Sequence, residues 1–85
     1  MCSFHTSSPS LINGRDAIKF SNNLLNYSSS IGVRFNGRTV NGKSPIGILS
    51  LSISKGNNIE IIVTGENEIY DAENIKHFLE GDYND

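Results

Sequence analysis

The sequence contains little that could cross-link the chain, span a membrane or hold nucleic acid. Cys2 is the only cysteine among 85 residues, so no internal disulfide can form, and this usage indicates a reducing compartment. The net charge is −2, whereas neutralising nucleic-acid phosphates needs a concentrated basic face, so direct nucleic-acid binding is not expected. No apolar run approaches the roughly 20 residues that span a bilayer, so we expect no membrane insertion.

Reactive groups are also scarce. His5 and His77 are the only histidines, and with one cysteine they give no metal-ligand spacing, so we expect no metal and no cofactor and interpret both histidines as incidental. No Ser–His–acid arrangement and no glycine-rich nucleotide loop is present, so the chain is not expected to be an enzyme. The first residues lack a basic stretch followed by an apolar one, and a soluble cytoplasmic protein is therefore expected.

The length suits a single domain over residues 1–85, and two segments have the spacing of amphipathic helices. In residues 14–27 the apolar positions are Ala17, Phe20, Leu24 and Tyr27, with Ile18 and Leu25 widening the stripe. In a last helix the shared face consists of Ile69, Ala72, Ile75 and Leu79. Gly81 should end that helix, and residues 82–85 should form an acidic frayed tail.

Strand patterns occupy most of the remaining chain. Alternation predicts strands at Ile31, Val33 and Phe35 and at Ile59, Ile61 and Val63, and residues 2–7 form a weaker strand anchored by Phe4. Asn36-Gly37 is a strong signal for a type I′ hairpin turn, after which residues 38–41 should return antiparallel. The order of helices and strands favours the α+β class, with helices covering one face of the sheet. Pattern alone leaves the strand order open.

A short helix is predicted from Pro45 to about Ser52. Ser44 can cap it, and proline fits the first helical position because no needed N–H is lost there. A phosphate on Ser44 would meet free N–H groups at this helix end. Ile48 and Leu51 should be buried, which would leave Ile46 and Leu49 as an exposed apolar patch beside Ser44. The alternative is that all of these side chains belong to the core.

Residues 36–51 resemble a known family. Their sequence, Asn-Gly-Arg-Thr-Val-Asn-Gly-Lys-Ser-Pro-Ile-Gly-Ile-Leu-Ser-Leu, is similar to the hairpin and second helix of HPr, the small phosphocarrier of the bacterial sugar phosphotransferase system. In that family Asn-Gly-Lys-x-x-x-x-Lys-Ser precedes an apolar helix. The resemblance extends from about Phe4 to Leu79. It implies an HPr-like open-faced β-sandwich, in which three helices cover one side of a four-stranded antiparallel sheet.

The family's phosphoacceptor histidine lies at the start of the first helix, in Leu-His-Ala-Arg-Pro-Ala. The matching residues here are Ile12-Asn13-Gly14-Arg15-Asp16-Ala17, so Asn13 replaces the histidine. An amide nitrogen is delocalised into its carbonyl and has no basic lone pair, so phosphoryl transfer through Asn13 is not expected, and the residue can simply cap the helix. The resemblance implies that Arg15 contacts phosphate or a partner. It is otherwise a solvated surface residue, and Asp16 weakens any anion site.

The second family site is Ser44. In HPr-like proteins of low-GC Gram-positive bacteria, HPr kinase/phosphorylase modifies this serine, and the product is a corepressor for a catabolite control transcription regulator. The resemblance implies that Lys43, Ile46 and Leu49 contact phosphate or partners, with Arg15 within reach of the phosphate. Pro45 departs from the usual aliphatic residue. A plain capping role is the alternative for Ser44.

These residues predict a non-catalytic HPr-like regulatory protein of carbon catabolite control. It is switched by serine phosphorylation and is closest in type to the Crh-like members that lack the histidine. One alternative is an HPr phosphocarrier with a divergent, inactive histidine site. Another is a scaffold or binding module that has lost both phosphorylation sites. The sequence leaves the oligomeric state open.

Overall fold

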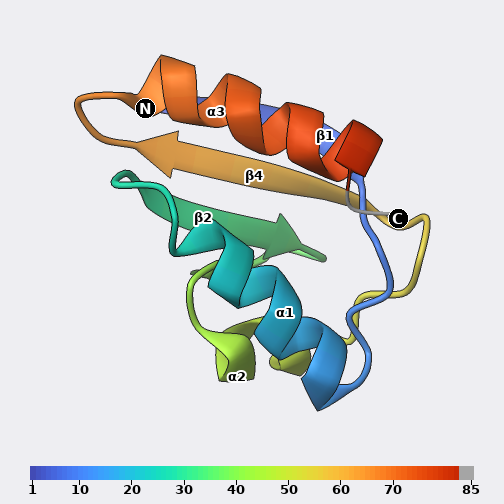
Figure 1. The fold of residues 1–85 in the computed structure, drawn as a ribbon. Helices are drawn as coiled ribbons and strands as arrows, with labels where there is room; N and C mark the ends of the chain where they lie inside the picture. Colours follow the sequence, from blue (N-terminus) through green and yellow to red (C-terminus); the bar gives the residue numbers. More distant parts are fainter. Residues whose placement is uncertain (83–85) are drawn as a thin grey trace.

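The computed structural model describes residues 1–82, which form a four-stranded antiparallel sheet with helices packed on one face (Figure 1). The elements are β1 (Cys2–Ser7), α1 (Gly14–Leu24), β2 (Ser30–Phe35), β3 (Arg38–Asn41), α2 (Pro45–Ser50), β4 (Asn58–Thr64), α3 (Glu68–His77) and the π-helical turn η1 (Phe78–Asp82). This order confirms the predicted α+β class, the open-faced sandwich and every strand and helix that the pattern indicated.

The strands lie in the order β1-β4-β2-β3, and every neighbouring pair is antiparallel. One cross-strand row on the helix-covered face consists of Phe4, Ile61, Val33 and Val40. The adjacent row consists of His5, Glu60, Arg34 and Thr39. Because side chains alternate along a strand, this second row lies on the uncovered face. Charged and polar residues therefore face solvent there, as one-sided alternation predicts.

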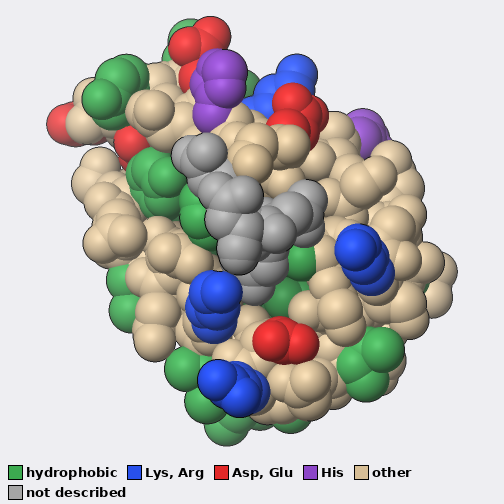
Figure 2. All heavy atoms as spheres, turned by 45° about the vertical axis from the view of Figure 1, so that its right-hand side comes forward, with side chains coloured by type: hydrophobic (Ala, Val, Ile, Leu, Met, Phe, Trp, Pro, Cys, Tyr) green, Lys and Arg blue, Asp and Glu red, His purple; other side chains and the backbone are tan. Residues whose placement is uncertain are grey.

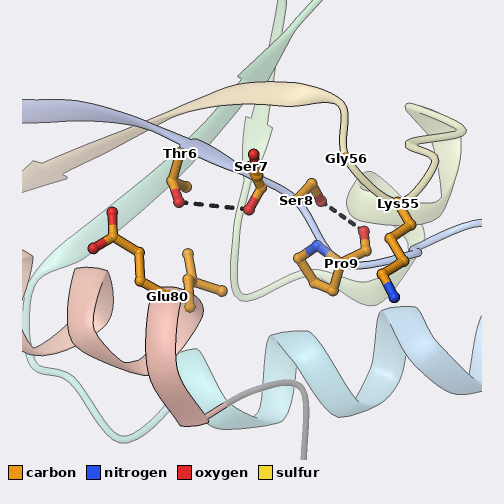
Figure 3. A pocket seen from close by; sticks show the side chains of 8 residues that line it. Thr6, Ser7, Ser8, Pro9, Lys55, Gly56 and Glu80 are labelled. Atoms are coloured by element: carbon orange, nitrogen blue, oxygen red, sulfur yellow. Dashed lines mark hydrogen bonds between the residues drawn. The ribbon is translucent and has the colours of Figure 1, made fainter.

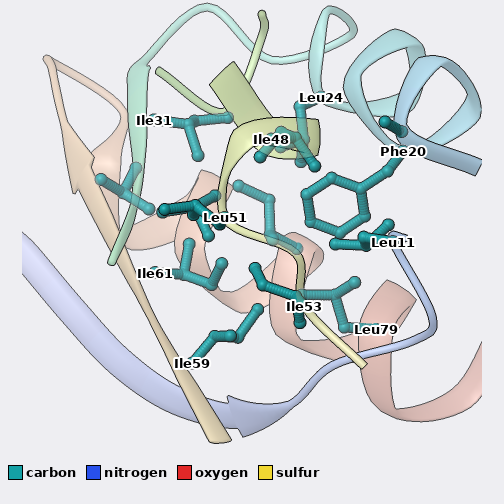
Figure 4. Close-up of a cluster of buried hydrophobic side chains, with 14 of the residues drawn as sticks. Leu11, Phe20, Leu24, Ile31, Ile48, Leu51, Ile53, Ile59, Ile61 and Leu79 are labelled. Carbon is teal, nitrogen blue, oxygen red and sulfur yellow. The ribbon is translucent and has the colours of Figure 1, made fainter. Parts of the chain in front are cut away.

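The core lies between the covered sheet face and the helices (Figure 4). Its largest fully buried side chains include Phe20 and Leu24 of α1, Ile48 of α2 and Ile75 of α3. Strand residues Val33, Ile59, Ile61 and Val63 supply the other side. Two further core residues, Leu11 and Ile53, come from the connections β1–α1 and α2–β4 and are 0% exposed. The backbone N–H of Leu11 donates to the Ile53 carbonyl at 2.9 Å, so the two connections are also joined by a hydrogen bond.

The β2–β3 hairpin has the turn that its sequence predicted. Asn36 and Gly37 have φ values of 53° and 77°. Positive φ at both central positions defines a type I′ turn, whose twist matches that of the flanking strands. The turn fixes the register in which Phe35 faces Arg38. Through that register it also fixes where the chain leaves β3 towards α2.

The structure corrects the extent of two helical faces. Ile18 and Leu25 do not widen the buried stripe of α1, because they are 50% and 58% exposed, and the helix ends at Leu24 rather than Tyr27. Ile69 does not share the buried face of α3, since it is 68% exposed.

The structure also corrects the predicted end of the last helix. Gly81 does not end it, because η1 continues through this residue. Of the predicted acidic tail, Asp82 belongs to η1, and residues 83–85 lie outside the described residues.

Candidate functional site

The first candidate position is the N-cap of α1. Asn13 has an extended backbone, with φ −104° and ψ 159°, and its side-chain oxygen accepts a hydrogen bond from the Asp16 N–H at 2.9 Å. This bond satisfies one of the free N–H groups in the first helical turn. Asn13 therefore is a helix cap, as its sequence position indicated, and its side chain is exposed at the helix start.

Arg15 lies in the first turn of α1, and its side chain is exposed. Within residues 1–82 its guanidinium forms no hydrogen bond and no ion pair. Five N–H donors are thus free for a phosphate or carboxylate. The half-buried Asp16 beside it places a negative charge in the same turn. That charge competes with any anion for Arg15.

The second candidate position is the N-cap of α2. Ser44 has φ −107° and ψ 112°, its Oγ accepts a hydrogen bond from the Gly47 N–H at 3.3 Å, and Pro45 occupies the first helical turn. The predicted start of this helix is therefore confirmed. The preceding turn is held by Asn41, whose carbonyl accepts from the Ser44 N–H at 3.0 Å. The side-chain oxygen of Asn41 accepts from the Lys43 N–H, also at 3.0 Å.

Lys43 has a structural partner that the sequence did not reveal. Its Nζ donates a hydrogen bond to the Tyr27 carbonyl oxygen at 2.6 Å. The sequence associated Lys43 with a phosphate on Ser44. In the structure its ammonium instead joins the turn before α2 to the segment just after α1.

Close packing fixes that turn in place. A Cβ atom added at Gly42 would lie 2.9 Å from Leu24 Cδ1 and 3.2 Å from Ile31 Cγ2, so only glycine fits without displacement. The Gly42 N–H donates to the Ile31 carbonyl at 2.7 Å. Ser44, two residues further on, is therefore held beside the C-terminal end of α1.

Arg15 and Ser44 lie on different elements. Arg15 is in the first turn of α1, whereas the turn that carries Ser44 packs against Leu24 at the other end of that helix. Nine residues of α-helix separate these ends by roughly 14 Å, at about 1.5 Å per residue. The reach of Arg15 to a phosphate on Ser44 stays a prediction from the family resemblance.

The apolar residues of α2 divide as the spacing predicted. Ile48 is 0% exposed and Leu51 is 7% exposed, whereas Ile46 is 82% exposed and Leu49 is 36% exposed. We call Ile46 and Leu49 the α2 patch. Ile46 follows the Ser44-Pro45 pair directly, so the patch begins within two residues of the Ser44 hydroxyl. The alternative in which all four side chains are core is wrong.

Arg38 holds the other end of α2. Its two terminal nitrogens donate to Ser50, one to the carbonyl oxygen at 3.3 Å and one to Oγ at 3.4 Å. The last carbonyls of a helix lack partners within it, and a cation there is favourable. No sequence pattern indicates this contact, because the hairpin turn and α2 are separate segments.

The two histidines lie on other elements than the two candidate positions, on β1 and α3. His5 is exposed on the uncovered face of the sheet, and its Nδ1 is 3.2 Å from Asn58 Oδ1. His77 is exposed in the last turn of α3. Neither histidine is located at the N-terminus of a helix.

One hollow on the surface lies away from the candidate residues. It has a volume of about 320 Å³ and is lined mainly by residues 6–9 together with Lys55, Gly56 and Glu80. Figure 3 shows Lys55 and Glu80 on opposite sides of it. The hydroxyls of Thr6 and Ser8 donate to backbone carbonyls of their own segment, at 3.5 Å and 2.8 Å. These groups stabilise the connection that follows β1, and the hollow brings no predicted site residues together.

The charged side chains do not gather into a single basic region on the face in Figure 2, where acidic side chains lie between the lysines and arginines. Among residues 1–82, no group of three or more His, Cys, Asp or Glu side chains is placed to hold a metal ion. In the same part of the chain no helix is both long and apolar enough to cross a bilayer.

Comparison with solved structures identifies several similar proteins. HPr-C-His from Thermoanaerobacter tengcongensis superimposes with a TM-score of 0.85 at 25% identity, over 100% of this chain and 98% of that one. HPr from Bacillus anthracis has a TM-score of 0.72 at 29% identity, over 93% and 99% of the two chains. The Bacillus subtilis catabolite repression containing protein Crh, in its swapped-domain dimer, has a TM-score of 0.70 at 25% identity, over 88% and 84%.

A family model supports the same assignment. The model described as the PTS HPr component phosphorylation site matches residues 4–81, a range that includes His5 as well as Asn13 and Ser44. The match spans nearly the whole chain, and the observed sheet and helices are those of the similar structures. The chain belongs to the HPr-like phosphocarrier family of the phosphotransferase system.

Proposed function

We propose that this chain is a non-catalytic HPr-like regulatory protein of carbon catabolite control, switched by phosphorylation of Ser44 and acting through protein–protein contacts. The observation that carries the proposal is the difference between the two helix starts. α1 begins at an asparagine that accepts a hydrogen bond from Asp16, whereas α2 begins at a serine beside the exposed α2 patch. Similarity to Crh adds support, because that protein is described by its link to catabolite repression.

The chemistry of Asn13 argues against a relay through this position. Phosphoryl transfer needs a nucleophile with an available lone pair, and the Asn13 nitrogen lacks one because it is conjugated with its carbonyl. The Oδ1 atom already accepts the Asp16 N–H. A protein of this type would receive no phosphoryl group from phosphoenolpyruvate at the family's usual position.

The chemistry of Ser44 favours a switch. Its hydroxyl makes one long hydrogen bond, at 3.3 Å, so a kinase gains access to Oγ at little cost. A phosphate adds about −1.5 to −2 charges and three strong acceptor oxygens. That charge would lie next to Ile46, so a partner could recognise an exposed apolar side chain and an anion together. Because α2 has six residues, the helix dipole contributes little, and the effect is on the surface rather than on the fold.

The partners that fit this role are HPr kinase/phosphorylase and a catabolite control transcription regulator. Both are implied by the family, as is a cytoplasmic location for a single domain spanning residues 1–85. Recognition would involve Ile46 and Leu49 with the phosphate, and Arg15 would contact a partner at the other end of α1. Lys43 could contribute only after releasing the Tyr27 carbonyl.

The test uses the two phosphorylation systems in turn. Incubation with the first enzyme of the relay and phosphoenolpyruvate should give no acid-labile phosphate by mass spectrometry. Incubation with HPr kinase/phosphorylase and ATP should add one phosphate at Ser44 and raise affinity for the catabolite regulator. Ser44→Ala should stay within about 1 kcal/mol of wild-type stability, the scale of a lost cap, and should lose the kinase-dependent binding. If the chain binds the catabolite regulator with equal affinity with and without kinase treatment, the proposal is wrong.

A phosphocarrier role is the second candidate, because the matched family model describes a phosphorylation site and its range contains His5. The exposed imidazole on β1 would then be the acceptor. Transfer from phosphoenolpyruvate that disappears in His5→Gln and persists in Ser44→Ala would establish this alternative. If neither system adds phosphate, the chain is a scaffold that has lost both modifications. Replacing Pro45 by an aliphatic residue, the type usual in the family, would then test whether proline prevents phosphorylation of Ser44.

A further inference from the structure

A second surface lies on α3, away from the α2 patch (Figure 1). Between the end of α1 and α3 there is a hollow of about 450 Å³, which we call the α3 hollow. Its lining includes Tyr27, Tyr70, Asp71, Asn74, His77 and Phe78. The proposed function uses none of these side chains, and the family resemblance assigned them no role.

The floor of the α3 hollow contains a carboxylate without a cation. Asp71 is 5% exposed, and its Oδ2 accepts hydrogen bonds from the Ser29 N–H at 3.2 Å and the Ser29 hydroxyl at 2.6 Å. Its other oxygen takes no hydrogen bond from residues 1–82, and no lysine, arginine or histidine there forms an ion pair with it. A buried charge without a counter-charge is costly, so an arriving cation would gain free energy here.

The walls of the hollow suit a flat cation. The lining includes two aromatic residues, Tyr27 and Tyr70, and the face of an aromatic ring attracts cations through the ring quadrupole. The carboxylate also acts on the Tyr27 phenol. Burial, then the charge of Asp71, then Tyr70 raise the pKa of this phenol above its ordinary value of 10.0. The Asn74 Nδ2 donates to the Tyr70 carbonyl at 2.9 Å, which leaves the amide oxygen of Asn74 as an acceptor.

The surface around the α3 hollow extends this chemistry. Ile69 and Tyr70 are 68% and 70% exposed, and they lie next to the acidic residues Glu66 and Glu73. Residues 56–75 contain no lysine or arginine. The nearby basic groups are Lys76, the rim residue His77, and Lys43, whose ammonium is bound to the Tyr27 carbonyl. The N-terminal ammonium of Met1 also lies at this helix, where it pairs with Glu68 at 2.7 Å. The surface is thus both acidic and apolar around a buried carboxylate.

The geometry points to a docking site on α3 for a partner protein, in which an arginine side chain enters the α3 hollow and meets Asp71. A guanidinium is planar, offers five N–H donors and stacks on aromatic rings, so it matches the carboxylate, the Asn74 oxygen and the tyrosine faces together. The exposed Ile69 favours a protein segment over a free small cation, because an apolar neighbour of the arginine would cover it. This inference is independent of phosphorylation at Ser44.

The experiment is a nuclear magnetic resonance titration of the full ¹⁵N-labelled chain with a blocked Leu-Arg-Leu peptide. A matched blocked peptide with citrulline, the neutral isostere of arginine, is the control ligand. We expect saturable shifts of the amides of Tyr27, Tyr70, Asp71 and Asn74, with the citrulline peptide binding about tenfold more weakly. Blocked arginine amide alone should bind more weakly than the tripeptide.

Three variants complete the test. Tyr70→Ala removes an exposed wall and should weaken arginine-peptide binding about threefold or more, and Asp71→Asn should abolish it. Ile46→Ala, on the α2 patch, should leave binding unchanged. Equal affinity for the two tripeptides, unchanged binding in Tyr70→Ala, or no saturable shift would each overturn the inference. Arginine amide binding as tightly as the tripeptide would overturn the assignment to a partner protein.

Discussion

The Lys43 ammonium donates a hydrogen bond to the Tyr27 carbonyl oxygen at 2.6 Å, and this contact joins the turn before α2 to the chain just after α1. Since Ser44 follows Lys43 directly, the position of the candidate switch depends on this bond as well as on the close packing at Gly42. A residue that the sequence associated with phosphate is thus also part of the framework that holds the serine.

The first prediction tests this contact. Lys43→Met keeps most of the apolar stem and removes the donor, and we expect the free energy of unfolding to fall by about 1–2 kcal/mol, since hydrogen bonds to charged groups contribute at this scale. Chemical denaturation with constant m-value measures the change. Lys55→Met, at an exposed loop position, is the control and should stay near wild type. Equal stabilities of the two variants would contradict the structural role of Lys43.

The second prediction concerns the centre of the sheet. Val33 and Ile61 are direct cross-strand neighbours, and both are 0% exposed. Truncating either to alanine should cost about 2–4 kcal/mol through lost burial and the cavity left behind. A small domain has only about 5 kcal/mol or somewhat more to lose, so calorimetry should show a large fall in Tm. Ile46→Ala, at 82% exposure, should melt within a degree or two of wild type.

Local patterns predicted the elements but not every buried face. Alternation at Val33 and Ile61 identifies strands because the period of two persists over several residues. Ile69 illustrates the limit: steps of three residues, as from Ile69 to Ala72 to Ile75, each drift about 60° around a helix with 3.6 residues per turn. Ile69 ends about 120° from Ile75 and faces solvent.

Contacts between segments distant in sequence were beyond prediction. The bond between Asp71 and Ser29 spans 42 residues, and neither residue stands in a recognisable motif. Leu11 and Ile53 are core residues in connections, where no periodicity marks them. For the candidate site, the caps at Asn13 and Ser44 followed from residue type and position. The distance between Arg15 and Ser44 depends on how α1 and α2 pack, which no local pattern encodes.

The third prediction arises from a polar atom inside the core. Ser21 is 1% exposed, at a position of α1 between Phe20 and Leu24 where an apolar residue would be expected, and its Oγ has no hydrogen-bond partner among residues 1–82. An unsatisfied buried hydroxyl costs about 1–3 kcal/mol. We therefore expect Ser21→Ala to stabilise the protein.

A control variant separates this effect from helix propensity. Asn22→Ala, at the exposed neighbouring position, gains propensity alone, roughly half a kcal/mol. Ser21→Ala should exceed that gain by about 1 kcal/mol in denaturant unfolding. A Ser21→Ala variant no more stable than Asn22→Ala would show that the hydroxyl finds a partner in solution, such as water.

The fourth prediction concerns the alkaline limit of stability. Burial, then the charge of Asp71, then Tyr70 raise the pKa of the Tyr27 phenol above its ordinary value of 10.0. The folded protein therefore holds this proton more tightly than the unfolded chain does. The resulting stabilisation is fully present below pH 10.0 and is lost as the pH rises through the folded pKa. Tyr27→Phe cannot lose a proton there, so between pH 8 and pH 11 its Tm should fall less than that of the wild type. Parallel Tm curves across this range would mean that the Tyr27 phenol ionises equally easily in both states, and that Asp71 does not act on it as the structure indicates.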